Sequence, residues 1–322
     1  MPSSRAGASP APTNDNSPAE SCIGIAPTCK VRKTGYNPAG ATILYNMTSA
    51  LNRPWIIAHR GASAYEPANT LRAFRRAMEQ GAELSELDLH LSKDGALIVM
   101  HNPTVDQTTN GHGAIRDQTL AELRLLDAGH VERVPTFHAV IDLVRGRHGL
   151  YIELKAEGTP RPTVDLLRAN ALIARRDTAS SRADGGAGRR GRPADRQAIV
   201  GSFQPELVRE TKELAPELSV SLLVGPVYPA QELIALAHAA RADYVHRCWE
   251  NRAPQPHKLL TPELLRALRE AGLGIVLWHE ERVEELRVLC TLDVDAICTN
   301  TPDKLGELSR SQTVVLSEAK NL

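Results

Sequence analysis

The chain has 322 residues, of which 42% are hydrophobic and 24% are charged. Its 38 basic and 38 acidic side chains cancel, so no overall field attracts nucleic acid or an anionic membrane, and a nucleic-acid-binding role is disfavoured. The length fits one large domain or two modest ones, since single α/β barrels commonly reach about 250 residues.

The two ends of the chain and its cysteines carry few structural signals. Residues 1–52 are rich in Ser, Pro, Ala, Asn and Gly without a sustained hydrophobic period, which predicts a flexible leader. No apolar run approaches the about 20 residues of a membrane span, and the N-terminus lacks the apolar core of a secretory signal. We therefore expect a cytoplasmic protein without a transmembrane segment. The five cysteines have no C-x-x-C spacing, which favours buried free thiols.

From Trp55 onward, short apolar runs typical of strands alternate with amphipathic runs typical of helices. The expected strand and helix pairs are 56–59 with 69–80, 84–89 with 119–126, 150–154 with 163–175, 198–202 with 205–214, 219–224 with 230–241, 243–246 with 261–271, 274–278 with 281–290, and 295–299 with 302–308. Such repeated units predict a parallel sheet closed into a TIM (β/α)8 barrel over residues 53–310. An open doubly wound sheet is the alternative, although no glycine-rich phosphate loop follows the first strand.

A β-hairpin is predicted after the second strand. Residues 93–95, Lys-Asp-Gly, form a tight turn, and the chain then returns through 97–100 to His101. If the turn is centred on its last two residues, His101 lies opposite Asp88; if it is centred on the first two, His101 lies opposite Glu86. Either register places the histidine on the face that carries both acids.

Two further segments stand outside the barrel pattern. Residues 176–197 contain no apolar side chain larger than alanine, so burial cannot offset their ordering entropy and a disordered insertion is predicted. Residues 311–322 are expected to form a C-terminal tail. Within the barrel, Thr261 and Thr301 each precede a proline and are expected to cap helices, and Gly272 is expected to end the first of these.

The acidic residues of the second and third strands are candidates for a metal site. Glu86 and Asp88 share one face because residues two apart on a strand point the same way. Glu153 lies between apolar neighbours on the next barrel strand, so it is expected to point into the barrel beside them. Three adjacent carboxylates repel one another unless a cation binds. A ligand set made only of oxygen atoms favours Mg²⁺ or Ca²⁺ over zinc.

Two histidines are expected to flank these acids. His59 and His101 end two different strands, and an imidazole pKa near 6.5 allows each to accept or donate a proton at neutral pH. Arg60 and Lys155 add donors suited to phosphate oxygens, so the residues together predict phosphodiester cleavage. Trp278 is expected either to pack in the barrel or to border the substrate. The remaining strand and loop histidines are interpreted as surface or hydrogen-bonded residues: His90, His138, His148 and His257.

Six motifs, in this order, resemble those of the glycerophosphodiester phosphodiesterases, a family of the PLC-like phosphodiesterase TIM-barrel superfamily. They are HRGASAYEPANTLRAF from His59, SELDLHLSKDGALIVMHNPTVDQTTNG from Ser85, YIELK from Tyr151, GSFQPEL from Gly201, VLWHE from Val276 and DAICTNTPDKL from Asp295. The resemblance implies a phosphoric diester hydrolase that converts glycerophosphodiesters to an alcohol and glycerol 3-phosphate.

The resemblance also implies roles for individual residues. His59 and His101 are the implied acid and base, and Glu86, Asp88 and Glu153 are the implied ligands of a divalent cation, Mg²⁺ or Ca²⁺. The implied substrate-binding residues are Arg60, Lys155, Phe203 and Trp278. The expected partner is a small glycerophosphodiester or a lysolipid.

Three positions depart from the pattern of the family. Ala68 stands where P-E-N-T has an acid, Asn102 where H-D has an aspartate, and His279 where W-T has a threonine. Glu66, two positions before Ala68, is a candidate to reach the same space. Two alternative functions remain open: lysophospholipase D activity on larger lipids, and a catalytically impaired barrel that binds a phosphorylated ligand.

Overall fold

The computed structural model describes residues 53–173, 198–248 and 253–310. The leader, the insertion at 176–197 and the C-terminal tail predicted above therefore lie outside the described residues. Within the described ranges, nine strands form one sheet in the order β1-β9-β8-β7-β6-β5-β4-β2-β3, and an additional pairing of β1 with β2 closes it. Eight strands are parallel and form the predicted TIM barrel, while β3 pairs antiparallel to β2 at its edge.

Each barrel strand is a short run that is buried over nearly all its length. The bounds are β1 Trp55–Ala58, β2 Leu84–Leu91, β4 Gly149–Leu154, β5 Ala198–Ser202, β6 Ser219–Val224, β7 Tyr244–Cys248, β8 Gly274–Trp278 and β9 Ala296–Thr299, and β3 spans Leu97–Val99. Parallel strands that are covered on both faces need apolar residues on both, which is why they were visible in the sequence as continuous runs.

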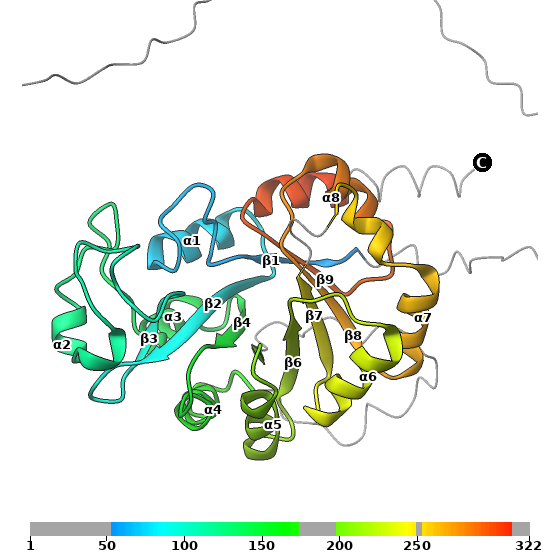
Figure 1. The fold of residues 1–322 in the computed structure, drawn as a ribbon. Coiled ribbons are helices and arrows are strands. Elements are labelled where there is room, and N and C mark those ends of the chain that lie inside the picture. Colours follow the sequence, from blue (N-terminus) through cyan, green and yellow to red (C-terminus); the bar gives the residue numbers. More distant parts are fainter. Residues whose placement is uncertain (1–52, 174–197, 249–252, 311–322) are drawn as a thin grey trace, which may run out of the picture. The chain divides into compact units, whose positions relative to one another are not determined.

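Helices cover the outside of the strands (Figure 1). Their bounds are α1 Leu71–Glu79, α2 Leu120–Leu123, α3 Phe137–Val144, α4 Pro160–Ala169, α5 Pro205–Leu214, α6 Ala230–Ala239, α7 Pro262–Glu270 and α8 Val283–Leu289, with short 3-10 turns η2 Ile115–Asp117 and η3 Pro256–Leu259. One more helix begins at 302 and is described to 310. Thr261 caps α7 by accepting from the Leu264 amide, and Gly272 follows that helix with φ +74°, as predicted. No helix in the described part of the chain is both long and apolar enough to cross a bilayer.

The helix that was expected after the second barrel strand differs from the prediction. The segment 119–126 contains only the four-residue α2, whose start is fixed by a capping box between Thr119 and Glu122. The helix between β3 and β4 that packs against α1 and β3 is α3, which the sequence prediction missed. Apolar side chains fill most of Phe137–Val144, so its sequence shows little of the alternation between apolar and polar faces that identified the other helices.

The predicted register of the β2–β3 hairpin was wrong. Leu89 pairs with Val99 and Leu91 with Leu97, which leaves a three-residue turn over 93–95 in place of a two-residue turn. This register would place His101 opposite Leu87, on the face away from the acids. The antiparallel pairing ends at Val99, however, and the chain then leaves the strand. The position of His101 is therefore set by the loop after β3 and not by the ladder.

The interior of the barrel is divided into an apolar part and a polar part along the strand direction. Side chains that point inward from the N-terminal halves of the strands form a buried cluster that includes Ile57, Leu84, Tyr151 and Val276. On the first three barrel strands the next inward position toward the C-terminal end is polar, in the steps from Ile57 to His59, from Leu84 to Glu86 and from Tyr151 to Glu153. The apolar layer thus fills the barrel beneath a polar site at the C-terminal ends of the strands.

Gly61 permits a close approach between the end of β1 and α1. Its φ is +80°, and a Cβ at this position would lie 2.6 Å from the carbonyl carbon of Ala73. Gly81 has nearly the same φ, +79°, but open space where a Cβ would stand. Gly81→Ala is expected to cost about 1–2 kcal/mol for the backbone conformation alone. Gly61→Ala is expected to lower the free energy of unfolding by about 1–3 kcal/mol more than Gly81→Ala does, because the methyl group overlaps the helix backbone. Urea unfolding of both variants measures the difference, and equal losses would contradict the close approach.

Candidate active site

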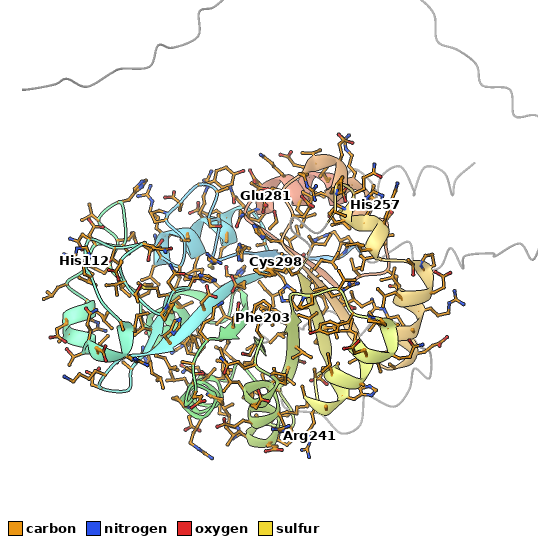
Figure 2. The ribbon with its side chains drawn as sticks, viewed as in Figure 1. His112, Phe203, Arg241, His257, Glu281 and Cys298 are labelled. Atoms are coloured by element: carbon orange, nitrogen blue, oxygen red, sulfur yellow. The ribbon has the colours of Figure 1, made fainter. Side chains whose placement is uncertain are left out.

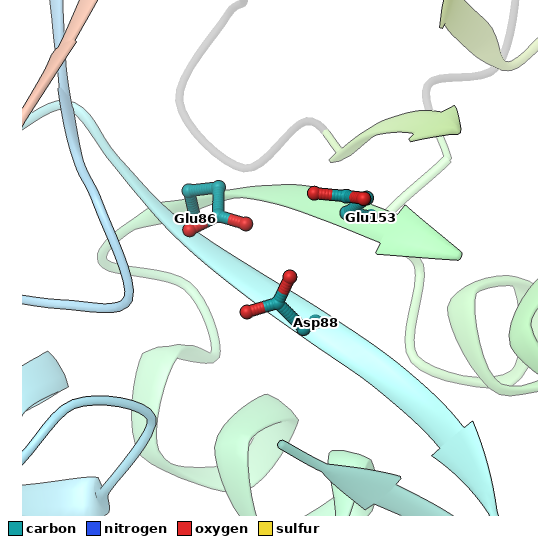
Figure 3. Close-up of side chains that lie close together, drawn as sticks. All are labelled: Glu86, Asp88 and Glu153. Carbon is teal, nitrogen blue, oxygen red and sulfur yellow. The ribbon is translucent and has the colours of Figure 1, made fainter. Parts of the chain in front are cut away.

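Three carboxylates from two neighbouring strands meet at the polar end of the barrel (Figure 3). In the parallel ladder, Asp88 of β2 pairs with Glu153 of β4, and Glu86 lies one inward step before Asp88. One carboxylate oxygen of each residue lies within 4.8 Å of the other two, and all three side chains are buried. The predicted convergence of these acids is therefore present, and we refer to Glu86, Asp88 and Glu153 as the acidic triad.

Basic and amide groups surround the acidic triad. Lys155 Nζ lies 2.5 Å from Glu153 Oε1 and 3.1 Å from Asp88 Oδ1. Arg60 donates its backbone N–H to Glu86 Oε2 at 2.8 Å, and its Nε lies 3.5 Å from Asp88 Oδ2. The predicted phosphate-binding residues therefore both lie at the triad.

The positive charges of Arg60 and Lys155 act unequally on the three acids. Burial raises the pKa of Glu86 well above its usual value, and burial together with Asp88 raises the pKa of Glu153 to about 7. Burial also opposes ionisation of Asp88, but Lys155 and Arg60 outweigh it and lower that pKa to about 2. The two basic side chains thus compensate Asp88 and leave both glutamates short of positive charge.

The triad has the chemistry that a divalent cation requires. Its donors are all carboxylate oxygens, which suit Mg²⁺ and Ca²⁺. Asp88 Oδ1 is buried and accepts no hydrogen bond from the described residues, although the Lys155 ammonium is in ion-pair range. A cation between these oxygens would favour the ionised forms of both glutamates, so the residues present fit a hard divalent ion.

Both ring nitrogens of His59 form hydrogen bonds. Its Nδ1 donates to Asn300 Oδ1 at 2.8 Å, since an amide oxygen can only accept, and Ser63 Oγ donates to the same oxygen. Trp278 Nε1 donates to His59 Nε2 at 3.0 Å, so Nε2 carries the lone pair. Burial, followed by the charges of Arg60 and His279, lowers the pKa of His59 well below 6.5. The ring is therefore neutral, with Nε2 as its basic atom.

His101 lies on the loop that follows β3 and is partly exposed. Its Nδ1 donates to Asn102 Oδ1 at 2.7 Å, and its backbone carbonyl accepts from His90 Nε2 at 3.1 Å. Burial lowers the pKa of His101, while the charge of Asp88 raises it. The charge of Asp88 also raises the pKa of His59, so both histidines lie within electrostatic reach of the triad.

Aromatic side chains form one wall of the site. The rings of Phe203 and Trp278 meet edge to face with centroids 5.6 Å apart, and Lys155 Nζ lies 5.9 Å from the Phe203 centroid. Phe203, which is labelled in Figure 2, comes from the loop after β5. Its exposed fraction is 39%. Trp278 packs against the buried apolar cluster of the barrel, as one of its two interpretations expects, and also donates to His59. We call Phe203 and Trp278 the aromatic wall.

Four residues near the site were not predicted to belong to it. Asn69 Nδ2 donates to Asp88 Oδ2 at 2.8 Å, and Asn300 orients His59. The His279 ring lies against the His59 ring with centroids 4.6 Å apart. Glu281 accepts from the Asn300 backbone N–H at 2.7 Å and lies 3.6 Å from His279 Nε2. Asn69 lies in a matched motif, and His279 and Asn300 each follow the end of a predicted strand, which was the available signal; Glu281 stood at the start of a predicted helix and carried no such signal.

The residue Ala68 leaves a small space beside the site. A cavity of about 20 Å³ is lined by Ala68 together with Arg60, Asn69 and His101. The proposal that Glu66 reaches this space was wrong, because the Glu66 carboxylate is ion-paired with Arg72 and Glu66 does not line the cavity. Glu66 therefore does not take the place of the acid that the family motif has where this chain has Ala68.

The four histidines interpreted as surface or hydrogen-bonded residues match that interpretation, whereas only one of the three described cysteines is fully buried. The polar contacts of these histidines are His90 with the His101 carbonyl, His138 with Asp142, His148 with Ser85, and His257 with Glu285. Cys298 is a buried free thiol, as expected. Cys248 and Cys290 are also free thiols but only partly buried.

Residues 59–304 match the sequence profile of the Glycerophosphoryl diester phosphodiesterase family. A glycerophosphodiester phosphodiesterase of Caldanaerobacter subterraneus is 33% identical over 265 residues, which cover 79% of this chain and 97% of that protein. A glycerophosphodiester phosphodiesterase of Bacillus subtilis is 30% identical over 292 residues, or 85% of this chain and 92% of that protein. The crystal structure of a glycerophosphodiester phosphodiesterase from Agrobacterium tumefaciens superposes with a TM-score of 0.64 at 28% identity, covering 79% of this chain and 99% of that one.

The profile match begins at His59 and includes the whole acidic triad, His101 and the aromatic wall. The fold, the extent of the matches and the residues at the strand ends agree with one another. The chain therefore belongs to the glycerophosphoryl diester phosphodiesterase family.

Proposed function

We propose that this protein hydrolyses glycerophosphodiesters to an alcohol and glycerol 3-phosphate with the help of a divalent cation. The observation that carries the proposal is a buried acidic triad with two histidines in its electrostatic field, at the end of a barrel where such enzymes place their chemistry. Membership of the family, with full-length relatives named as glycerophosphodiester phosphodiesterases, supports the same reaction.

The acidic triad would hold the cation. Glu86, Asp88 and Glu153 each offer a carboxylate oxygen, and their hardness favours Mg²⁺ or Ca²⁺. When bound, the ion would supply Lewis-acid stabilisation of the charge that develops on the phosphoryl oxygens. Asn69 fixes the orientation of the Asp88 carboxylate by donating to its second oxygen.

The remaining residues would bind the phosphate and move protons. Arg60 and Lys155 are placed to donate to phosphoryl oxygens, since both already lie at the triad. One histidine takes a proton from a glycerol hydroxyl or a water, and the other donates a proton to the departing alcohol oxygen. His59 suits the exchange because Asn300 fixes its tautomer and leaves Nε2 basic.

Release of glycerol 3-phosphate from glycerophosphocholine by the full chain tests the proposal. We expect release to stop when a chelator removes divalent cations and to return on addition of Mg²⁺ or Ca²⁺, because the two glutamates cannot both stay ionised without added positive charge. Release that is insensitive to the chelator would contradict the metal part of the proposal. Absence of release with either ion would favour the alternative, a barrel that binds a phosphorylated ligand without turnover.

A further inference from the structure

A large groove opens next to the candidate active site, on the side of β2 and β4. Its volume is about 650 Å³, and it lies between the loop after β3 and the loop after β4. Ligand sites in proteins commonly measure about 300–1,000 Å³, so this groove has the size of a binding site. Its apolar lining consists of Leu91, Pro103, Ala114, Ile115 and Ala156. We call it the β2–β4 groove.

The β2–β4 groove is continuous with the catalytic residues. Lys155 lines it and also contacts Glu153 and Asp88, at 2.5 and 3.1 Å. His90 lines it too, and His90 Nε2 donates to the backbone carbonyl of His101. Lys155 and His90 thus link the groove to the acidic triad and to the loop of His101, so a group that leaves on this side of the site would enter the groove.

The opposite side of the site is built differently. The aromatic wall and His59 lie on the side of β5, β8 and β1, and Trp278 points its N–H at His59. The two ester oxygens of a phosphodiester occupy different corners of a tetrahedral phosphorus, so its two substituents point in different directions and can enter these two regions separately. The aromatic wall offers ring faces and polar neighbours, which suit the short, hydroxylated glycerol.

We infer that the β2–β4 groove binds the departing alcohol of the diester, and that this alcohol carries an extended apolar chain. The inference rests on the proposed function and names the substrate class for it. Small polar alcohols would leave most of the apolar lining exposed to water, whereas an alkyl chain would bury it. The two exposed charged residues of the groove, Arg116 and Glu157, are opposite in sign, and the third charged residue, Lys155, is already paired with Asp88 and Glu153, so the groove does not favour a charged alcohol.

The expected effect follows from the burial of methylene groups. Each buried methylene contributes about 0.8 kcal/mol, which corresponds to about a fourfold change in affinity. With glycerophosphoalkanols from ethanol to octanol, kcat/KM is therefore expected to rise about fourfold for each methylene that enters the groove. Short-chain alcohols avoid micelle formation, so the trend reports the site itself.

The wild-type full chain already gives a decisive result in this series. A rise of kcat/KM with chain length supports the groove as the leaving-alcohol site. A flat series with normal release of glycerol 3-phosphate overturns the inference while the proposed function stands. No release from any member of the series counts against the proposed function itself. Lysophospholipids carry their apolar chain on the glycerol, so they test the opposite assignment. A rise of kcat/KM with chain length that is seen only with lysophospholipids would overturn the assignment of the groove to the alcohol.

Two substitutions locate the effect within the groove. Ala156→Trp and Ala114→Trp place bulk on its two facing loops, and each is expected to bring the ratio of kcat/KM for octanol over ethanol diesters close to one. Because the measurement is a ratio of two kcat/KM values, a general loss of activity would not change it. If one of the two variants does not fold, the other still gives the test. Ala235→Trp, on the exposed face of α6, is the matched control and is expected to keep the wild-type ratio. An unchanged ratio in both groove variants overturns the location.

Discussion

The variants His59→Ala and His101→Ala are each expected to lose about 10²–10⁴-fold in kcat, the usual contribution of a positioned acid or base. Each imidazole has Nδ1 engaged by an amide oxygen, so its Nε2 is the atom that exchanges protons. His90 also lies within electrostatic reach of Asp88, but its Nε2 is engaged by the His101 carbonyl. Initial rates with glycerophosphocholine at saturating cation concentration measure the loss.

The matched control for these variants is His138→Ala. His138 is an exposed histidine on α3, with its Nδ1 3.2 Å from Asp142 Oδ2, and it lies outside the site. Its replacement is expected to leave kcat unchanged and to alter the unfolding free energy by no more than about 1 kcal/mol. Near-normal turnover in either His59→Ala or His101→Ala would remove that residue from the proposed acid and base pair.

A substrate with an activated leaving group separates the two roles. A nitrophenyl ester of glycerol phosphate needs little protonation of its departing oxygen, so the variant that lacks the general acid is expected to recover much of its rate. We expect that recovery in His101→Ala, because the His101 carbonyl accepts a hydrogen bond from His90, which lines the β2–β4 groove proposed for the departing alcohol. His59→Ala is expected to stay slow with the same substrate. The reverse pattern would exchange the two roles.

The acidic triad was predictable because strand geometry is nearly independent of the rest of the fold. Residues two apart on a strand share a face, which places Glu86 beside Asp88 without knowledge of any partner. Neighbouring parallel strands then bring Glu153 level with Asp88, as the observed ladder shows. The barrel itself was predictable for the same reason, since continuous apolar runs followed by capped helices leave few alternatives.

Other features depend on contacts that a single stretch of sequence does not encode. The hairpin register changed because the three-residue turn displaced the pairing by one position, and this reverses the face of every later side chain. Helix α3 was missed because its apolar residues show little periodicity. Asn300 and His59 are 241 positions apart and meet only when β9 pairs with β1 to close the barrel. Such a partner follows from topology and not from local pattern.

Glu153→Gln is expected to abolish high-affinity binding of Mg²⁺ or Ca²⁺ and to reduce kcat to near background. Loss of residues that only support metal ligands costs about 10–100-fold in affinity, so loss of a direct ligand is expected to cost at least that much. The amide has the shape of the protonated acid, which burial already favours, since the pKa of Glu153 is raised to about 7. The variant is therefore expected to fold without a large loss of stability.

Asp88→Asn serves as the contrasting change at the same site. Asp88 is buried and pairs with both Lys155 and Arg60, so its neutralisation leaves two partly buried cations short of a partner and is expected to destabilise the fold by about 3 kcal/mol. Calorimetric titration with each ion and urea unfolding distinguish the two variants: Glu153→Gln loses the ion alone, whereas Asp88→Asn loses the ion and stability together. Glu210→Gln, at an exposed position on α5, is expected to change neither. Wild-type cation affinity in Glu153→Gln would show that the ion is held elsewhere, and the triad would then be a structural charge cluster.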